Sequence, residues 1–170
     1  RRLHAAIVEG GHAAVYALIR RFDDETGESL GLLSTYDWGV QDLVRNPYID
    51  AMAMFDRRTV LDAGGYSTEL LDHGWFGWED YDLWLKLAQA GHRCSVAPNI
   101  VAAYRVHADS MIHRTNQSTE SLARYFHQKF GALVARFPGM DRYFGFPATA
   151  GAVAIDVASP EAHDAPEGLL

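Results

Sequence analysis

Apolar residues recur at helical spacing through the most informative stretch of the chain, residues 73–91. From Leu83 they appear at i, i+4 and i+7, which predicts an amphipathic helix. Gly91 is the residue type that commonly ends a helix in the left-handed conformation. The pattern places Asp80 at or just before the first turn, where free N–H groups and the helix dipole favour an ionised carboxylate.

The same patterns predict further helices and strands along the chain. Helical spacing and end signals favour helices at residues 2–9, 37–45, 57–63 and 120–137, the third capped by Asp56 and the last stopped by Pro138. Alternation and β-branched or aromatic content favour strands at residues 14–20, 49–55 and 100–107, and a short strand followed by a proline turn within 93–99. The polar residues 23–29 are typical of a turn.

Composition divides the chain into a domain and a tail. Beyond about residue 146 the sequence turns to Ala, Gly, Pro and acidic residues, a composition typical of a linker or of disorder. We therefore expect residues 1–137 to form the domain, and residues 138–170 to be a tail or linker that is partly disordered and holds no site.

Bulk properties exclude several classes of function. A net charge of −7 argues against nucleic acid or an anionic membrane surface as the main partner. The single cysteine, Cys94, excludes an internal disulfide and fits a reducing compartment. No apolar run reaches the roughly 18 residues of a transmembrane segment. Because the chain begins with Arg1 rather than Met, we expect it to be an excised piece of a longer protein.

Four short motifs then follow one another in a fixed order. They are FDRR at 55–58, GGY at 64–66, WEDYDLW at 78–84 and YRVHADS at 104–110. This order and spacing resembles the C-terminal, acceptor-side half of family 2 glycosyltransferases, over roughly residues 1–115. The resemblance implies an α/β fold, namely a partial GT-A fold in which a mixed sheet is flanked by helices.

The resemblance also implies roles for individual residues. Asp80 would be the general base that deprotonates the acceptor hydroxyl, and Glu79 would help to position the acceptor. His107 would be a metal ligand beside the donor diphosphate, with Mn²⁺ or Mg²⁺ as the cofactor. Enzymes of this type invert the anomeric centre in one displacement, while the metal stabilises the leaving nucleotide diphosphate.

Further residues would bind the substrates. By the same resemblance, Trp78 and the turn formed by Gly64, Gly65 and Tyr66 would line the acceptor pocket. Arg105 would approach a donor phosphate. The implied partners are a nucleotide-sugar donor and a carbohydrate or lipid-linked acceptor. The implied location is the bacterial cytoplasm or the inner face of its membrane, in cell-wall or polysaccharide biosynthesis.

The chemistry is consistent with these roles. A sugar hydroxyl is a poor nucleophile, so a placed carboxylate is needed to accept its proton. Asp80 and His107 are 27 positions apart, too far for one helix face, but they can meet if the strand at 100–107 lies beside the helix start. The family's D-x-D motif and its nucleotide-binding half are missing, so we expect no transferase activity from this chain alone. An incomplete sheet should also leave an unpaired strand edge, from which we expect self-association.

Three alternatives were compared with this interpretation. Glu79 and Asp80 can serve only as helix caps, because acidic residues are common in first turns. The chain can also be a non-catalytic carbohydrate- or nucleotide-binding scaffold. A glycoside hydrolase that uses these two carboxylates fails on geometry, because neighbouring side chains at a helix start cannot straddle a glycosidic bond across ~5 to 9 Å.

Overall fold

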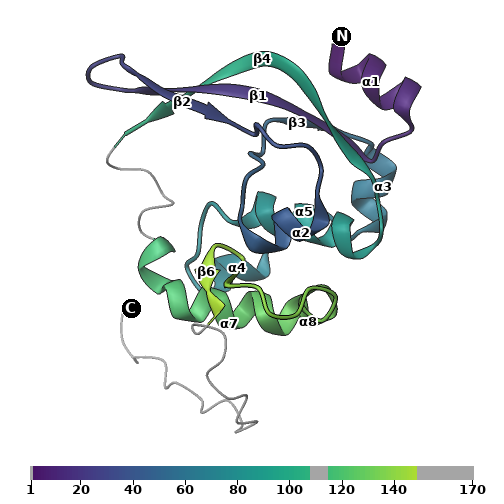
Figure 1. The fold of residues 1–170 in the computed structure, drawn as a ribbon, viewed down its shortest axis with the longest axis vertical. Helices are drawn as coiled ribbons and strands as arrows, with labels where there is room; N and C mark the ends of the chain where they lie inside the picture. The colour runs from purple at the N-terminus through teal and green to yellow at the C-terminus, as the bar shows by residue number, and fades with distance from the viewer. Residues whose placement is uncertain (1, 108–114, 149–170) are drawn as a thin grey trace, which may run out of the picture.

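A computed structural model describes residues 2–107 and 115–148 of the chain. Four of its strands form one mixed sheet, and helices cover both faces of that sheet (Figure 1). This is the α/β arrangement with a mixed sheet and flanking helices that the sequence predicts. None of the described helices is long and apolar enough to cross a membrane.

Strand β1 (Ala14–Asp23) is the centre of the sheet. Strand β4 (Cys94–Val106) pairs with it in parallel along its whole length. Strands β2 (Ser29–Leu33) and β3 (Ala53–Phe55) pair with it antiparallel, β3 near its start and β2 near its end. Because β4 occupies one edge of β1 throughout, β2 and β3 share the other edge.

The helices vary in length, and most of them lie on one side of the sheet. They are α1 (Arg2–Gly10), α2 (Val40–Arg45), α3 (Arg57–Asp62), α4 (Glu69–Asp72), α5 (Glu79–Gln89), α7 (Thr119–Lys129) and α8 (Gly131–Val134), with a 3₁₀ turn η1 (Asn116–Ser118) before α7. A small hairpin of β5 (Arg142–Tyr143) and β6 (Phe146–Pro147) follows α8.

The two faces of the sheet bury different clusters. On one face, Val15 and Ala17 of β1 pack with Ala97 of β4 under the apolar side of α1. On the other face, the Tyr16 ring meets the Trp84 ring of α5 edge-on, with 5.8 Å between the ring centroids. Beyond α5, α7 adds a further layer (Figure 1). The larger core thus lies between the sheet and α7, with α5 at its centre.

The second half of the sheet differs from the prediction of two strands within 93–107. A single strand, β4, runs through the whole segment, including Pro98. Its register against β1 shifts after Ala97, so that the next paired residue is Ile100. Pro98 therefore sits in a bulge, where its missing N–H costs no ladder bond. The expected proline turn was wrong because the bulge absorbs the proline.

The helix predicted over 120–137 is interrupted. It forms as α7 and α8, and Phe130 between them has a non-helical backbone (φ −112°, ψ 30°). The interruption lets Phe130 and Leu133 both reach the core, where each is 1% exposed. Two other predicted elements are shorter than expected, since α2 begins only at Val40 and β3 only at Ala53. Strand β2 was not predicted, and it is largely exposed.

Part of the expected tail packs on the domain. Phe144, between β5 and β6, is fully buried, and its N–H donates to the Val44 carbonyl at 2.6 Å. The packed part of the chain therefore continues to residue 148, past the expected boundary at 137. Residues 149–170 of the expected tail lie outside the described residues.

Candidate active site

An open pocket of about 900 Å³ lies where the start of α5, the loop before β3 and the end of β4 meet. Its lining includes five of the residues singled out in the sequence, which are Trp78, Glu79, Asp80, Arg105 and His107. These residues come from the start of α5 and the end of β4, which are separated in the sequence by the rest of α5 and most of β4. The structure therefore brings together the carboxylates and the histidine that the motif order linked.

The first turn of α5 positions the two carboxylates. Trp78 is the N-cap residue and makes no side-chain cap, so the carboxylates themselves meet the nearby N–H groups. Glu79 Oε2 accepts from the Gly77 N–H at 2.9 Å, and Asp80 Oδ1 accepts from the Tyr81 N–H at 2.7 Å. Glu79 is exposed, whereas Asp80 is half-buried. Each carboxylate thus accepts a hydrogen bond from a nearby backbone N–H and also lines the pocket.

The surroundings of Asp80 raise the pKa of its carboxyl group. Burial, the largest effect, raises its pKa, and the negative charges of Glu79 and Asp50 raise it further, to about 7. The Tyr81 N–H, which stabilises the charged form, opposes this shift. Near neutral pH, Asp80 therefore exists in both protonation states, as a general acid or base requires.

The chain at the end of β4 supplies Arg105 and His107 to the pocket. Its pairing with β1 ends at Val106, and His107 follows immediately as an exposed residue. The Arg105 side chain is 62% exposed, with one guanidinium nitrogen 3.5 Å from Asp24 Oδ1. Such a loose, solvated ion pair adds little stability, so Arg105 can turn to another anion at small cost.

Trp78 lies mostly in the core, although it also lines the pocket. Only 6% of it is exposed, and its ring stacks on Phe146 with 5.6 Å between centroids. Its Nε1 donates to Asn116 Oδ1 at 3.1 Å. Little of the indole face is left for a sugar, so its main contribution is to hold the loop before Asp80.

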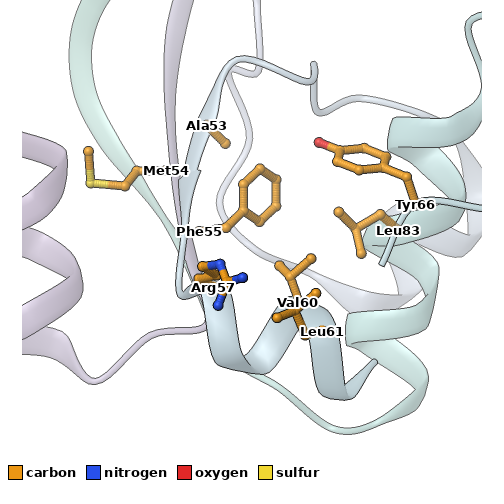
Figure 2. Close-up of a pocket in the computed structure, with 8 residues that line it drawn as sticks. All are labelled: Ala53, Met54, Phe55, Arg57, Val60, Leu61, Tyr66 and Leu83. Atoms are coloured by element: carbon orange, nitrogen blue, oxygen red, sulfur yellow. The ribbon is translucent and has the colours of Figure 1, made fainter. Parts of the chain in front are cut away.

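Tyr66 of the Gly64–Gly65–Tyr66 turn lines a different pocket, and neither glycine lines either pocket. Both glycines have positive φ (87° and 64°), which allows the chain to reverse after α3. Tyr66 lies on the wall of a second pocket of about 400 Å³, beside Leu83 of α5 (Figure 2). Burial raises the pKa of Tyr66, and the charges of Asp80 and Glu79 add to this effect. The turn is therefore a neighbour of the carboxylates but does not line their pocket.

A metal site is not complete among the residues that the structure describes. Within residues 2–107 and 115–148, no group of three or more His, Cys, Asp or Glu side chains lies close enough to hold a metal ion. His107 supplies one imidazole at the pocket, but these residues do not fit a Mn²⁺ or Mg²⁺ ion by themselves. The Mn²⁺ or Mg²⁺ cofactor therefore stays a prediction.

Two further polar residues of the pocket were missed. Asp50 precedes β3, and its Oδ1 accepts from the Met52 N–H at 2.9 Å. Asn116 starts η1 and holds Trp78. Asp50 fell at a polar position of the expected strand 49–55, and Asn116 within a polar stretch. Polarity alone did not set either residue apart from a solvated surface position.

No protein-family model matches the chain, and a search of curated proteins finds no significant match. The glycosyltransferase resemblance therefore depends on the four motifs and on where their residues lie.

Proposed function

We propose that this chain is the acceptor-side part of an inverting glycosyltransferase with a partial GT-A fold. The observation that carries the proposal is the shared pocket of Asp80 and His107, with Glu79 and Arg105 beside them. A binding scaffold has no need of a half-buried carboxylate whose pKa is raised to about 7, whereas a general base does.

In the proposed reaction, Asp80 accepts the proton of an acceptor hydroxyl. The hydroxyl oxygen forms a bond to the anomeric carbon of the donor sugar, from the face opposite the nucleotide diphosphate. The bond between that carbon and the diphosphate oxygen breaks, and its electron pair leaves with the diphosphate. The anomeric configuration is thereby inverted, and the proton remains on Asp80 until solvent removes it.

The neighbouring residues assist this step. The negative charge of Glu79 beside Asp80 favours the protonated form that Asp80 takes as the hydroxyl attacks the anomeric carbon. Arg105, held only loosely by Asp24, can approach an anionic phosphate of the donor. His107 is the residue that would bind Mn²⁺ or Mg²⁺ if other ligands join it. The donor class, a nucleotide sugar, and a carbohydrate or lipid-linked acceptor belong to the same proposal.

The test measures nucleotide release by the full-length gene product. UDP-, GDP- and dTDP-sugars are offered with and without Mn²⁺ to the wild type and to Asp80→Asn. We expect release by Asp80→Asn to fall about 100-fold or more, the usual contribution of a general base. Asp62→Asn, at the end of α3 and outside the pocket, is the matched control and should retain full release.

Equal release by Asp80→Asn and wild type would refute the assignment. The hydrogen bonds of Glu79 and Asp80 to local N–H groups would then describe two helix-capping residues in a non-catalytic scaffold. Thermal melting of both variants separates a catalytic loss from a folding defect.

A further inference from the structure

The second pocket, of about 400 Å³, is lined almost entirely by apolar side chains. Figure 2 shows Phe55 of β3 at its centre, with Val60 of α3, Leu83 of α5 and the Tyr66 ring around it. Met54 points away from this cluster, because successive side chains of a strand face opposite sides. Strand β3, α3 and α5 thus form three walls of one apolar concavity.

Apolar surface at this pocket remains accessible to solvent. Leu61 of α3 is 55% exposed and Tyr66 is 48% exposed, although both line the pocket. Burying such surface is favourable at about 25 cal/mol per Å². The concavity is therefore suited to a ligand with an apolar group of its own rather than to a bare sugar.

One charged residue completes the lining. Arg57, the first residue of α3, lies beside Phe55 and Val60 in Figure 2. It forms no ion pair with any residue that the structure describes. The protein carries a net charge of −7, so a positively charged edge at an apolar pocket is a local exception. It complements a ligand that carries a negative charge next to its apolar group.

The two pockets are neighbours. Leu83 of the apolar pocket lies three residues after Asp80 on α5, which places both on the same side of the helix. Ala53 of the apolar pocket follows Met52 of the larger one along the chain. Tyr66 lies near enough to Asp80 and Glu79 for their charges to raise its pKa. A single extended molecule can therefore contact both pockets.

We propose that the apolar pocket binds an aryl or alkyl group of the acceptor, and that Arg57 binds a negative charge carried beside that group. This inference rests on the proposed function, because only that function makes the bound molecule an acceptor, with its hydroxyl at Asp80. It narrows the acceptor class from carbohydrate or lipid-linked acceptors in general to anionic amphiphiles.

Binding can be measured without any sugar nucleotide. The probes are 1-anilinonaphthalene-8-sulfonate, which is aromatic and anionic, and N-phenyl-1-naphthylamine, which is aromatic and neutral, each titrated by fluorescence. Leu61→Asp should weaken the binding of both probes about tenfold, because it puts a charge into the apolar wall. Leu71→Asp is the matched control, since Leu71 of α4 is 53% exposed but lies outside the pocket.

A second pair of variants tests the charge. Arg57→Gln should weaken binding of the sulfonate about two- to fivefold, the effect of losing an exposed ion pair. Binding of the neutral amine should stay unchanged. Arg58→Gln removes the neighbouring charge, which does not line the pocket, and should change neither probe. Equal effects of Leu61→Asp and Leu71→Asp, or no probe binding by the wild type, would overturn the inference. An Arg57→Gln protein that binds both probes as the wild type does would overturn its anionic part.

The link to the acceptor is tested in the full-length gene product. A carboxyphenyl glycoside should support faster nucleotide release than the methyl glycoside of the same sugar, and Leu61→Asp should abolish that advantage. An unchanged advantage in Leu61→Asp would refute the acceptor assignment. Probe binding at the pocket together with release that does not need Asp80 would refute the proposed function and leave the pocket intact. Nucleotide release that needs Asp80, together with a lack of probe binding, would refute the apolar binding pocket and leave the proposed function intact.

Discussion

Lys129 Nζ of α7 lies 2.7 Å from Asp82 Oδ1 of α5, and the Asp82 side chain has no exposed surface. Lys86 Nζ lies 3.2 Å from the other oxygen, Oδ2, which also accepts a 2.5 Å hydrogen bond from Ser67 Oγ. Lys129 further contacts the Glu69 carboxylate. One buried carboxylate thus joins α5, α7 and the segment after the Gly64–Gly65–Tyr66 turn.

Replacing Lys129 by Met should destabilise the protein strongly. The change leaves the Asp82 charge buried with only Lys86 near it, and breaking a buried pair on one side typically costs about 3–5 kcal/mol. Urea denaturation followed by tryptophan fluorescence measures this loss. Arg124→Met removes an exposed charge from the same helix and should change the free energy of unfolding little.

The double variant Lys129→Met with Asp82→Asn separates charge from packing. Because the uncompensated charge is then absent, it should recover part of the stability lost in Lys129→Met. A double variant that is less stable than Lys129→Met by the full cost of Asp82→Asn alone would show that the two side chains do not interact.

The stability of the protein should fall between about pH 4 and pH 7 through Asp80. Its pKa is raised from 3.8 to about 7 in the folded state, so folding favours the protonated form. The stabilisation is complete below the unfolded-state pKa and is lost as the pH rises through the folded-state value. At about pH 8, Asp80→Asn should therefore be more stable than wild type by on the order of 1–3 kcal/mol.

Thermal melts from about pH 3.5 to pH 8 check this prediction, with Asp62→Asn as the control. The advantage of Asp80→Asn should shrink as the pH falls toward 4, and Asp62→Asn should follow the wild type. A constant difference across this range would mean that Asp80 has an ordinary pKa, which would also remove support for its role as a base.

Much of the framework follows from local sequence patterns. The helices around Leu3, Arg57 and Leu83 were predicted because their apolar faces or end signals are visible in short windows. The predictions that failed concern features that depend on residues far away in the sequence. The bulge that absorbs Pro98 exists only because β1 continues beside it, and Phe144 is buried only because α2 and α7 reach that segment.

The candidate site shows the same division. The order of motifs indicated that Asp80 and His107 could come together if the strand at 100–107 lies beside the helix start, and both residues line one pocket. The sequence did not reveal that Trp78 is buried, because an aromatic residue beside glycines suits a core and a ligand surface equally well. Nor did it separate Tyr66 from the main pocket, since a turn's direction is set by packing that spans the whole domain.

Asp56 should stabilise α3 in a pH-dependent way. Its Oδ1 accepts from the Thr59 N–H at 2.7 Å and from the Thr59 hydroxyl at 2.8 Å, as the predicted cap requires. The bond from the Thr59 N–H lowers the pKa of Asp56. The contribution is therefore present above the unfolded-state pKa and is lost as the pH falls through the lower folded-state value.

Asp56→Ala should lower the urea midpoint near neutral pH, and the difference from wild type should disappear in acid. Asp56→Ser is the matched variant, because serine keeps a side-chain acceptor at the cap without a titrating charge. It should retain most of the neutral-pH stability. A midpoint for Asp56→Ala equal to that of the wild type at every pH would contradict the capping role.

Strand β4 should mediate self-association. Its only described partner is β1, so its other edge is unpaired among the described residues, and Ile100 and Val101 on it are 59% and 47% exposed. Apart from Arg105 near its end, β4 carries no charged residue, and an exposed edge with few charges is a template for pairing with a second copy. We expect light scattering to show a concentration-dependent dimer, and Val101→Lys to shift it toward monomer.

Leu71→Lys adds the same charge at a similarly exposed site on α4 and should leave the dimer intact. A wild-type protein that is monomeric at all concentrations, or equal effects of the two lysines, would rule out an interface at this edge.

The parallel pairing of β1 with β4 also governs the order in which the chain can fold. Ala14 pairs with Cys94, 80 positions later, and the helices α2 to α5 lie between them. Closing so long a loop costs entropy before any contact repays it, and such non-local pairing slows folding. During synthesis, the apolar first half of β1 must wait for the residues of β4, about 80 positions later, to leave the ribosome before β4 covers its edge. A chaperone that shields residues 14–19 during that interval would therefore be expected to raise the yield of folded protein more than one acting on the completed chain.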